Sequence, residues 1–229
     1  LAPGAENACG ITALLHLAEV LSQRKPHYSI LFLATSGHFE GLAGVNDFLY
    51  KHARKSEYFR DRMENPIDFR LFISLDLSSQ NDQVAAFSQG TFYSGWATDN
   101  YVKNLMAPYA RRFHRYVAAA FPGQAGSSRF IDAVAPSKQA WKDFMPVGLA
   151  LDSEAPVFVG LSAISLVTPD DLRRRVDTPL DRLEHTDTEA LARQIQTIGV
   201  ILLEATRDPG LFGESALQLK DQGHSLAGQ

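Results

Sequence analysis

The chain has 229 residues, 45% of them hydrophobic and 21% charged, with a formal net charge of −4. These values exclude wholesale disorder and give no basic footprint for nucleic acid or an anionic membrane. The sequence has no run of about 18 apolar residues, so no membrane span is predicted. Because Cys9 is its single cysteine, an internal disulfide is excluded.

Helical and strand patterns alternate along the first part of the chain. Apolar residues at helical spacing predict a helix over 7–23, with Asn7 as its cap, and a second helix over Leu42–Arg54. Between them, the apolar run Ser29–Thr35 predicts a strand covered on both faces. Two further buried strands are predicted over Phe69–Leu77 and Gln83–Ser88.

The second part of the chain continues the alternation after a longer interruption. Helical spacing over Asp99–Phe121 predicts a helix that Pro108 either kinks or starts anew. The remaining predictions are a long loop over Phe121–Pro136, a helical turn at Trp141–Phe144, a strand over Ser162–Val167 and a helix over Glu189–Thr206.

Alternating strands and helices predict an α/β fold with a mostly parallel sheet and helices on both faces. We expect one α/β domain over residues 1–206 and a polar, glycine-containing tail over residues 207–229. The chain opens at Leu1 without a methionine or a charged-then-apolar leader, which predicts an excised domain or a processed fragment.

Five segments stand in the order and spacing of one family's landmarks. They are PGAENACGITALLHLAEVL (3–21), ILFLATSGHFEGLAG (30–44), FISLDL (72–77), DSEAPVFVGLSAISL (152–166) and RRRVDTPLDRL (173–183). In these segments the chain resembles the co-catalytic zinc aminopeptidase and glutamate carboxypeptidase family, which includes transferrin-receptor-like and nicastrin-like ectodomains.

The resemblance covers residues 1–206 and implies a three-layer αβα fold. Its sheet is expected to be mixed and mainly parallel, with the family's N-terminal strands absent from this chain. It also implies that a first metal ligand, a His in a strand-end His-x-Asp, belongs upstream of Leu1, and it suggests a location outside the cytoplasm.

The first landmark reads Gly-Ala-x-Asp-Asn-Ala-Ser-Gly in active members, whose Asp bridges two zinc ions. Glu6 stands at that position here, and its extra methylene displaces the carboxylate oxygens. Glu6 is therefore a candidate metal ligand, although a carboxylate near a helix N-terminus is favourable through the helix dipole alone. Cys9, in the same segment, is expected to be a buried, inert thiol rather than a nucleophile.

The second landmark, Gly-Glu-Glu-x-Gly-Leu-x-Gly, supplies a general base and a zinc ligand. The resemblance puts His38 at the base position and Phe39 at the ligand position, where a phenyl ring cannot bind zinc. Glu40 could take the ligand's place only by a slip of one residue. His38 could instead be a structural histidine bonded at a strand end.

The later landmarks keep the ligand Asp and the Asp of the Asp-Thr pair but lose two histidines. Asp76 matches the family's ligand Asp, and either holds metal or pairs with Arg173, which stands where the last His would be. The segment around Glu154 has no His, whereas Asp177 of the family's Asp-Thr pair is kept. Apart from that pairing, the charges at 170–175 predict a solvated charge run, or an anion pocket.

The resemblance thus places Phe39, Glu40, Glu154, Arg173 and Asp177 along the former cleft. We expect a domain that has lost its two-zinc site, binds no cofactor, and acts with a protein or peptide partner within a larger protein. The alternative is an active zinc aminopeptidase or carboxypeptidase in which Glu6 and Asp76 hold metal and His38 or Glu40 activates water. A rigid spacer is a third possibility.

Overall fold

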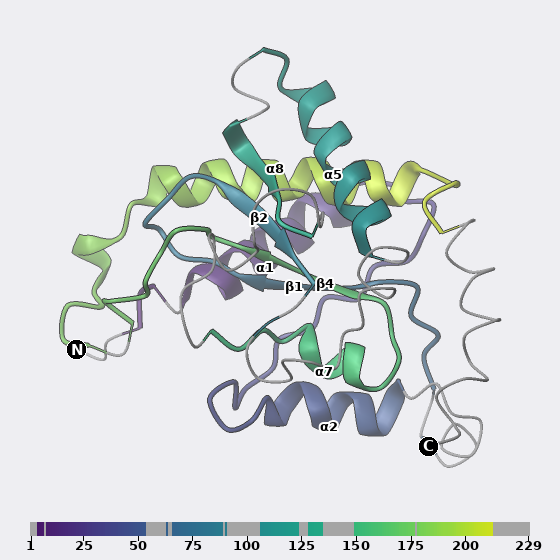
Figure 1. The fold of residues 1–229 in the computed structure, drawn as a ribbon, viewed down its shortest axis with the longest axis horizontal. Helices are drawn as coiled ribbons and strands as arrows, with labels where there is room; N and C mark the ends of the chain where they lie inside the picture. Colours follow the sequence, from purple (N-terminus) through teal and green to yellow (C-terminus); the bar gives the residue numbers. More distant parts are fainter. Residues whose placement is uncertain are drawn as a thin grey trace.

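A computed structural model describes residues 4–6, 8–53, 63, 66–88, 90, 106–123, 128–134, 149–176 and 178–212. Within them a mixed four-stranded sheet lies between two layers of helices (Figure 1). The predicted cap Asn7 and the predicted turn Trp141–Phe144 lie outside the described residues.

The sheet has the spatial order β1-β4-β2-β3. Its strands are β1 (Phe72–Asp76), β2 (Val84–Phe87), β3 (Phe130–Asp132) and β4 (Ala163–Val167). β1 pairs parallel with β4, and β2 parallel with β3, whereas β2 and β4 are antiparallel. This arrangement confirms the predicted α/β class and the mixed, mainly parallel sheet.

β4 is buried along its whole length because helices cover both faces of the sheet. Ile164 and Leu166 belong to the larger core, together with residues of α1, α5 and α8. Val167 points to the other face, where it packs with Phe87 and Leu151. Side chains that alternate in this way place successive residues of one strand in two separate cores.

The helices divide between the two faces. They are α1 (Ala8–Ser22), α2 (Ala43–His52), α5 (Ala107–Ala120), α7 (Glu154–Phe158) and α8 (Thr188–Arg207). Figure 1 shows α5 and α8 above the strands and α2 and α7 below them. No helix in the described part of the chain is both long and apolar enough to cross a bilayer.

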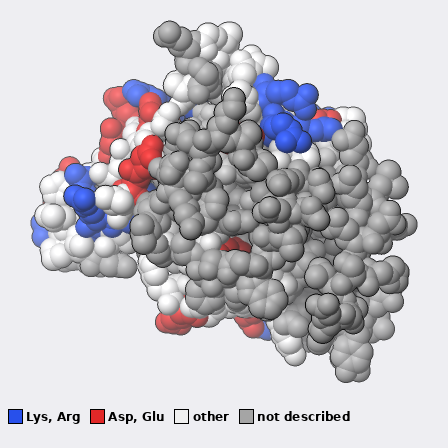
Figure 2. All heavy atoms as spheres, in the orientation of Figure 1, with Lys and Arg blue, Asp and Glu red and all other residues white. Residues whose placement is uncertain are grey.

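α5 begins at Ala107 with Pro108 in its first turn, a position that tolerates proline, and residues 99–105 of the predicted helix lie outside the described residues. Its buried face carries Phe113 and Val117, whereas Arg111 and Arg115 are exposed. In Figure 2, Lys and Arg side chains gather over the region of α5.

Two sequence predictions are wrong. Ser29–Thr35 forms no strand, and Leu31 is 51% exposed, since an apolar run becomes a strand only where a neighbouring strand pairs with it. The predicted loop Phe121–Pro136 contains β3, which is short and follows no long apolar run.

The start of the predicted tail belongs to the core. Leu211 is buried within the larger core, and the ring of Phe212 packs against Tyr28. Residues 213–229, the rest of the predicted tail, are outside the described residues.

Three buried serine hydroxyls connect the strands to the start of α7. The Ser165 Oγ of β4 lies 2.6 Å from Ser74 Oγ on β1 and 2.6 Å from Ser153 Oγ. Because buried hydroxyls need hydrogen-bond partners, these three linked hydroxyls hold Ser153, the residue before α7, against the sheet. They lie on the face of the sheet opposite the larger core.

Candidate functional site

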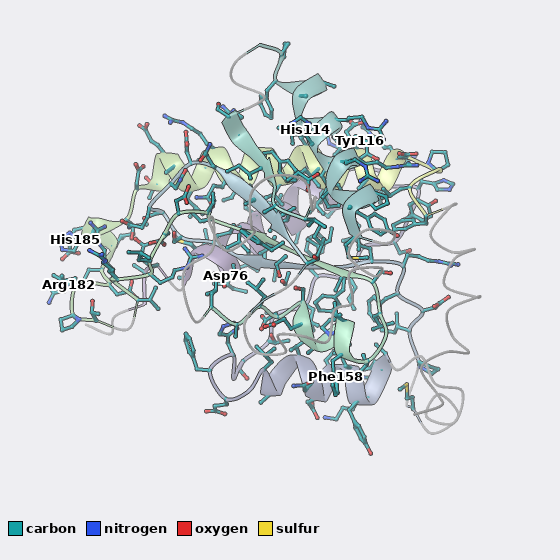
Figure 3. All side chains as sticks on the ribbon, in the orientation of Figure 1. Asp76, His114, Tyr116, Phe158, Arg182 and His185 are labelled. Carbon is teal, nitrogen blue, oxygen red and sulfur yellow. The ribbon has the colours of Figure 1, made fainter. Side chains whose placement is uncertain are left out.

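The carboxyl ends of β1 and β4 meet at one edge of the sheet because the two strands are parallel and in register, with Asp76 opposite Val167. The chain leaving β4 stays there, since the Thr168 N–H donates to the Asp76 carbonyl at 3.1 Å. Figure 3 shows Asp76 at this edge, with Arg182 and His185 farther out. Open α/β sheets place ligands beyond such strand ends.

Arg173 binds two carboxylates at this edge. Its Nη2 donates to Asp76 Oδ1 at 2.8 Å and to the Asp76 carbonyl at 2.9 Å. Its Nη1 donates to Asp171 Oδ2 at 2.6 Å, and its backbone N–H donates to Asp171 Oδ1 at 2.9 Å. We call Asp76, Asp171 and Arg173 the edge triad. The pairing of Asp76 with Arg173, one of the two predicted outcomes for Asp76, is therefore present.

The triad corrects the prediction of a solvated charge run for Asp171 and Arg173, whereas Asp170 and Arg174 are exposed. The side chains of Arg173 and Asp171 are only 13% and 8% exposed. Asp170 and Arg173 also have left-handed backbones, with φ of 55° and 50°. Such conformations are unfavourable for residues with a β-carbon, so they persist where surrounding contacts hold them.

The Asp171 carboxylate is stabilised in its charged form. Burial alone would raise its pKa, but the hydrogen bond from Ser78 and the positive charge of Arg173 outweigh burial and lower the pKa. The Asp171 carboxyl therefore keeps its negative charge to a lower pH than an ordinary aspartate does.

Glu6 lies two residues before the start of α1 and is buried. It accepts hydrogen bonds from the Ser79 backbone N–H at 2.7 Å, from Ser79 Oγ at 2.8 Å and from Gln80 Nε2. Its own N–H donates to Asp181 Oδ1 at 2.7 Å. Both carboxylate oxygens of Glu6 thus bind donors from the segment that follows β1.

Cys9 is buried beside Glu6, with its Sγ 3.8 Å from Glu6 Oε2. Burial, followed by the charge and hydrogen bond of Glu6, raises the pKa of the Cys9 thiol to about 12. The thiol stays protonated at neutral pH and is a poor nucleophile, which agrees with the predicted inert role.

The turn that carries His38, Phe39 and Glu40 is closed at both ends by glycine. Gly37 and Gly41 each have a φ of 71°. Phe39 is 73% exposed, and its ring packs edge-on against the ring of His38. Glu40 is exposed on the same turn.

Asp152 holds His38 in place, with 2.9 Å between His38 Nδ1 and Asp152 Oδ1. The hydrogen bond to Asp152 raises the pKa of His38, and burial opposes it. The charges of Asp76 and Glu154 also raise this pKa, although no hydrogen bond joins His38 to Asp76 within the described residues. Sequence reasoning did not single out Asp152, although it is the first residue of the segment 152–166.

Glu154 is buried at the start of α7 and accepts a hydrogen bond from the Leu151 N–H at 3.0 Å. Gly90 lies against its carboxylate, and a β-carbon there would leave no room. Asp177 lies outside the described residues. Among the side chains that the structure describes, no three His, Cys, Asp or Glu residues form a group able to hold a metal ion.

Comparisons with known proteins agree on a family and a fold. The sequence model of peptidase family M28 matches residues 2–202. No curated protein sequence matches the chain.

Among solved structures, an aminopeptidase from Aneurinibacillus sp. strain AM-1 aligns over 88% of this chain with a TM-score of 0.56 and 17% identity. BSAP, a zinc aminopeptidase from Bacillus subtilis, aligns over 90% with a TM-score of 0.54 and 16% identity. The chain spans only 39% and 42% of the lengths of these two proteins.

Proposed function

The chain belongs to peptidase family M28, and on that premise we propose a domain that binds a protein or peptide partner within a larger protein and has lost its two-zinc site. Phe39 is the observation that carries this proposal. It takes the position of a zinc ligand in the resemblance, offers no lone pair, and presents a 73% exposed ring. Exposed aromatic rings are characteristic anchors of binding surfaces.

The remaining donors fit a pair of zinc ions poorly. Asp76 already binds a guanidinium, and Glu6 already accepts hydrogen bonds from Ser79 and Gln80. Zinc would have to displace these contacts and lie beside the positive charge of Arg173, which repels it. We therefore assign no step of a reaction to a metal ion here.

One observation favours the alternative, a metal-dependent exopeptidase with a divergent site. His38 is oriented by Asp152, as a general base is oriented in many hydrolases, and the exposed Glu40 lies on the same turn. In that alternative Glu6 and Asp76 would hold the metal, at the cost of their present hydrogen bonds.

Zinc content and hydrolysis separate the two functions. We expect the purified full chain to contain well under one zinc ion per molecule and to leave amino-acid anilides intact, whereas the alternative requires about two ions and turnover. The double substitution Phe39→Glu with Arg173→His restores two donors and should increase zinc binding, which shows that the assay can detect a gain. Stoichiometric zinc with hydrolysis by the native chain would disprove the proposal.

The binding role has its own test. Phe39→Ala should weaken retention of the partner isolated with the native protein by roughly tenfold, because a truncated aromatic anchor costs more than 1 kcal/mol. The matched control is Leu15→Ala, which removes an exposed apolar side chain from α1. Equal retention by both variants would remove Phe39 from the binding surface.

A further inference from the structure

We infer that the Arg173 guanidinium is the resident cation of the edge triad: it neutralises Asp76 and Asp171 in place of a metal ion, and its removal leaves a cation site. This inference concerns the charge balance of the chain itself. It does not depend on which partner the domain binds.

The geometry supports a built position for the guanidinium rather than a chance surface contact. Arg173 donates through both terminal nitrogens to Asp76 Oδ1, the Asp76 carbonyl and Asp171 Oδ2, over 2.6–2.9 Å. A planar fork that donates to two carboxylates is a favourable use of arginine, and lysine cannot reproduce it.

The backbone supports the same conclusion. Arg173 keeps a left-handed φ of 50°, and its own N–H donates to Asp171 Oδ1. Asp171 in turn is bound by Ser78 from the segment after β1. Because this conformation is intrinsically unfavourable, the contacts of the triad must compensate for it.

Charge balance then predicts what happens without Arg173. The carboxylates of Asp76 and Asp171 and the Asp76 carbonyl oxygen now bind the Arg173 guanidinium. Without it, these largely buried oxygens would have no cation beside them. Unpaired buried carboxylates are unfavourable, and carboxylate and carbonyl oxygens are the ligands that calcium prefers. The variant should therefore be destabilised and should regain stability with calcium.

Thermal unfolding of the full chain in EDTA and in millimolar Ca²⁺ tests the inference. The native chain should unfold at the same temperature in both. Arg173→Met should unfold roughly 4–8 °C lower in EDTA and recover at least half of that loss in Ca²⁺. Adding Asp76→Asn to Arg173→Met should raise stability in EDTA and abolish most of the calcium response.

Arg112→Met is the matched control, since it breaks the Arg112–Asp208 pair of 2.7 Å and leaves one carboxylate rather than two. It should lose stability without a calcium response. The inference is overturned if EDTA destabilises the native chain, or if Arg173→Met responds to calcium no more than Arg112→Met. If Arg173→Met folds in neither condition, recovery of folding in the Asp76→Asn double variant supports the inference, and failure of both variants overturns it.

Discussion

At the scale of single residues, His38 couples the Phe39 turn to Asp152 through a bond whose strength depends on pH. The pKa of His38 is raised above its unfolded value of about 6.5, chiefly by the Asp152 hydrogen bond. A raised histidine pKa means that the folded state binds the proton more tightly than the unfolded state. The pair therefore stabilises the fold fully below about pH 6.5, and the contribution disappears as pH rises through the raised pKa.

We predict that Asp152→Asn destabilises the chain more at pH 5 than at pH 9, by about 1 kcal/mol or less, since both side chains are partly exposed. Unfolding free energies measured across this range provide the test. His38→Gln, which cannot titrate, should remove the pH dependence of the Asp152 effect. A larger effect at pH 9 would contradict the assignment.

The sequence predicted which residues belong to the site where a motif marks them. It did not predict their partners, which depend on contacts in the folded chain. The segment around Glu6 marked its carboxylate, but nothing in the sequence indicated that Ser79 and Gln80 bind it. For Arg173 the sequence allowed two alternatives, pairing with Asp76 or a place in a solvated run of charges. Burial resolves that choice, and burial depends on how the segment folds back over β1.

At the scale of elements, the long amphipathic helices, the partly buried strand β1 and the buried strands β2 and β4 follow from the sequence pattern. β3 and α7 could not be predicted in this way, because elements of three and five residues are too short to show a strand or helix periodicity. The prediction of a strand at Ser29–Thr35 was wrong for the opposite reason. The composition of the segment is that of a strand, but a strand also needs a neighbouring strand to pair with.

The start of α8 depends on a cap that periodicity does not reveal. Asp187 accepts hydrogen bonds from the Glu189 N–H at 3.0 Å and the Ala190 N–H at 2.9 Å. Asp187→Ala should cost about 1 kcal/mol, which lowers the unfolding temperature by roughly 2–4 °C. Asp187→Ser keeps an acceptor and should stay close to the native value. Equal losses for the two substitutions would indicate that the cap is not responsible.

At the scale of the whole molecule, the fold class was the most predictable property, since alternating elements allow few arrangements. The larger core joins α1, α5 and α8 to β2, β3 and β4, and residues of β1 also pack against it. The same fold aligns with only about two fifths of each aminopeptidase, so the activity of those proteins is not transferred with it.

Leu166 is fully buried on β4, whereas Leu180 is 59% exposed. Leu166→Ala should cost about 2–5 kcal/mol and lower the unfolding temperature by roughly 5–15 °C, because it leaves a cavity in the larger core. Leu180→Ala should change it little. Calorimetry of both variants tests whether β4 is the centre of the stabilising core.

The serine hydroxyls beneath α7 have an evolutionary consequence. Ser165 is the middle member, so an apolar replacement there would leave Ser74 and Ser153 each without its described partner, whereas replacement of Ser74 or Ser153 leaves Ser165 with one of its two described partners. Relatives that lose the central hydroxyl should therefore have lost both outer ones as well. These three positions, 91 residues apart at the extreme, should mutate as a set.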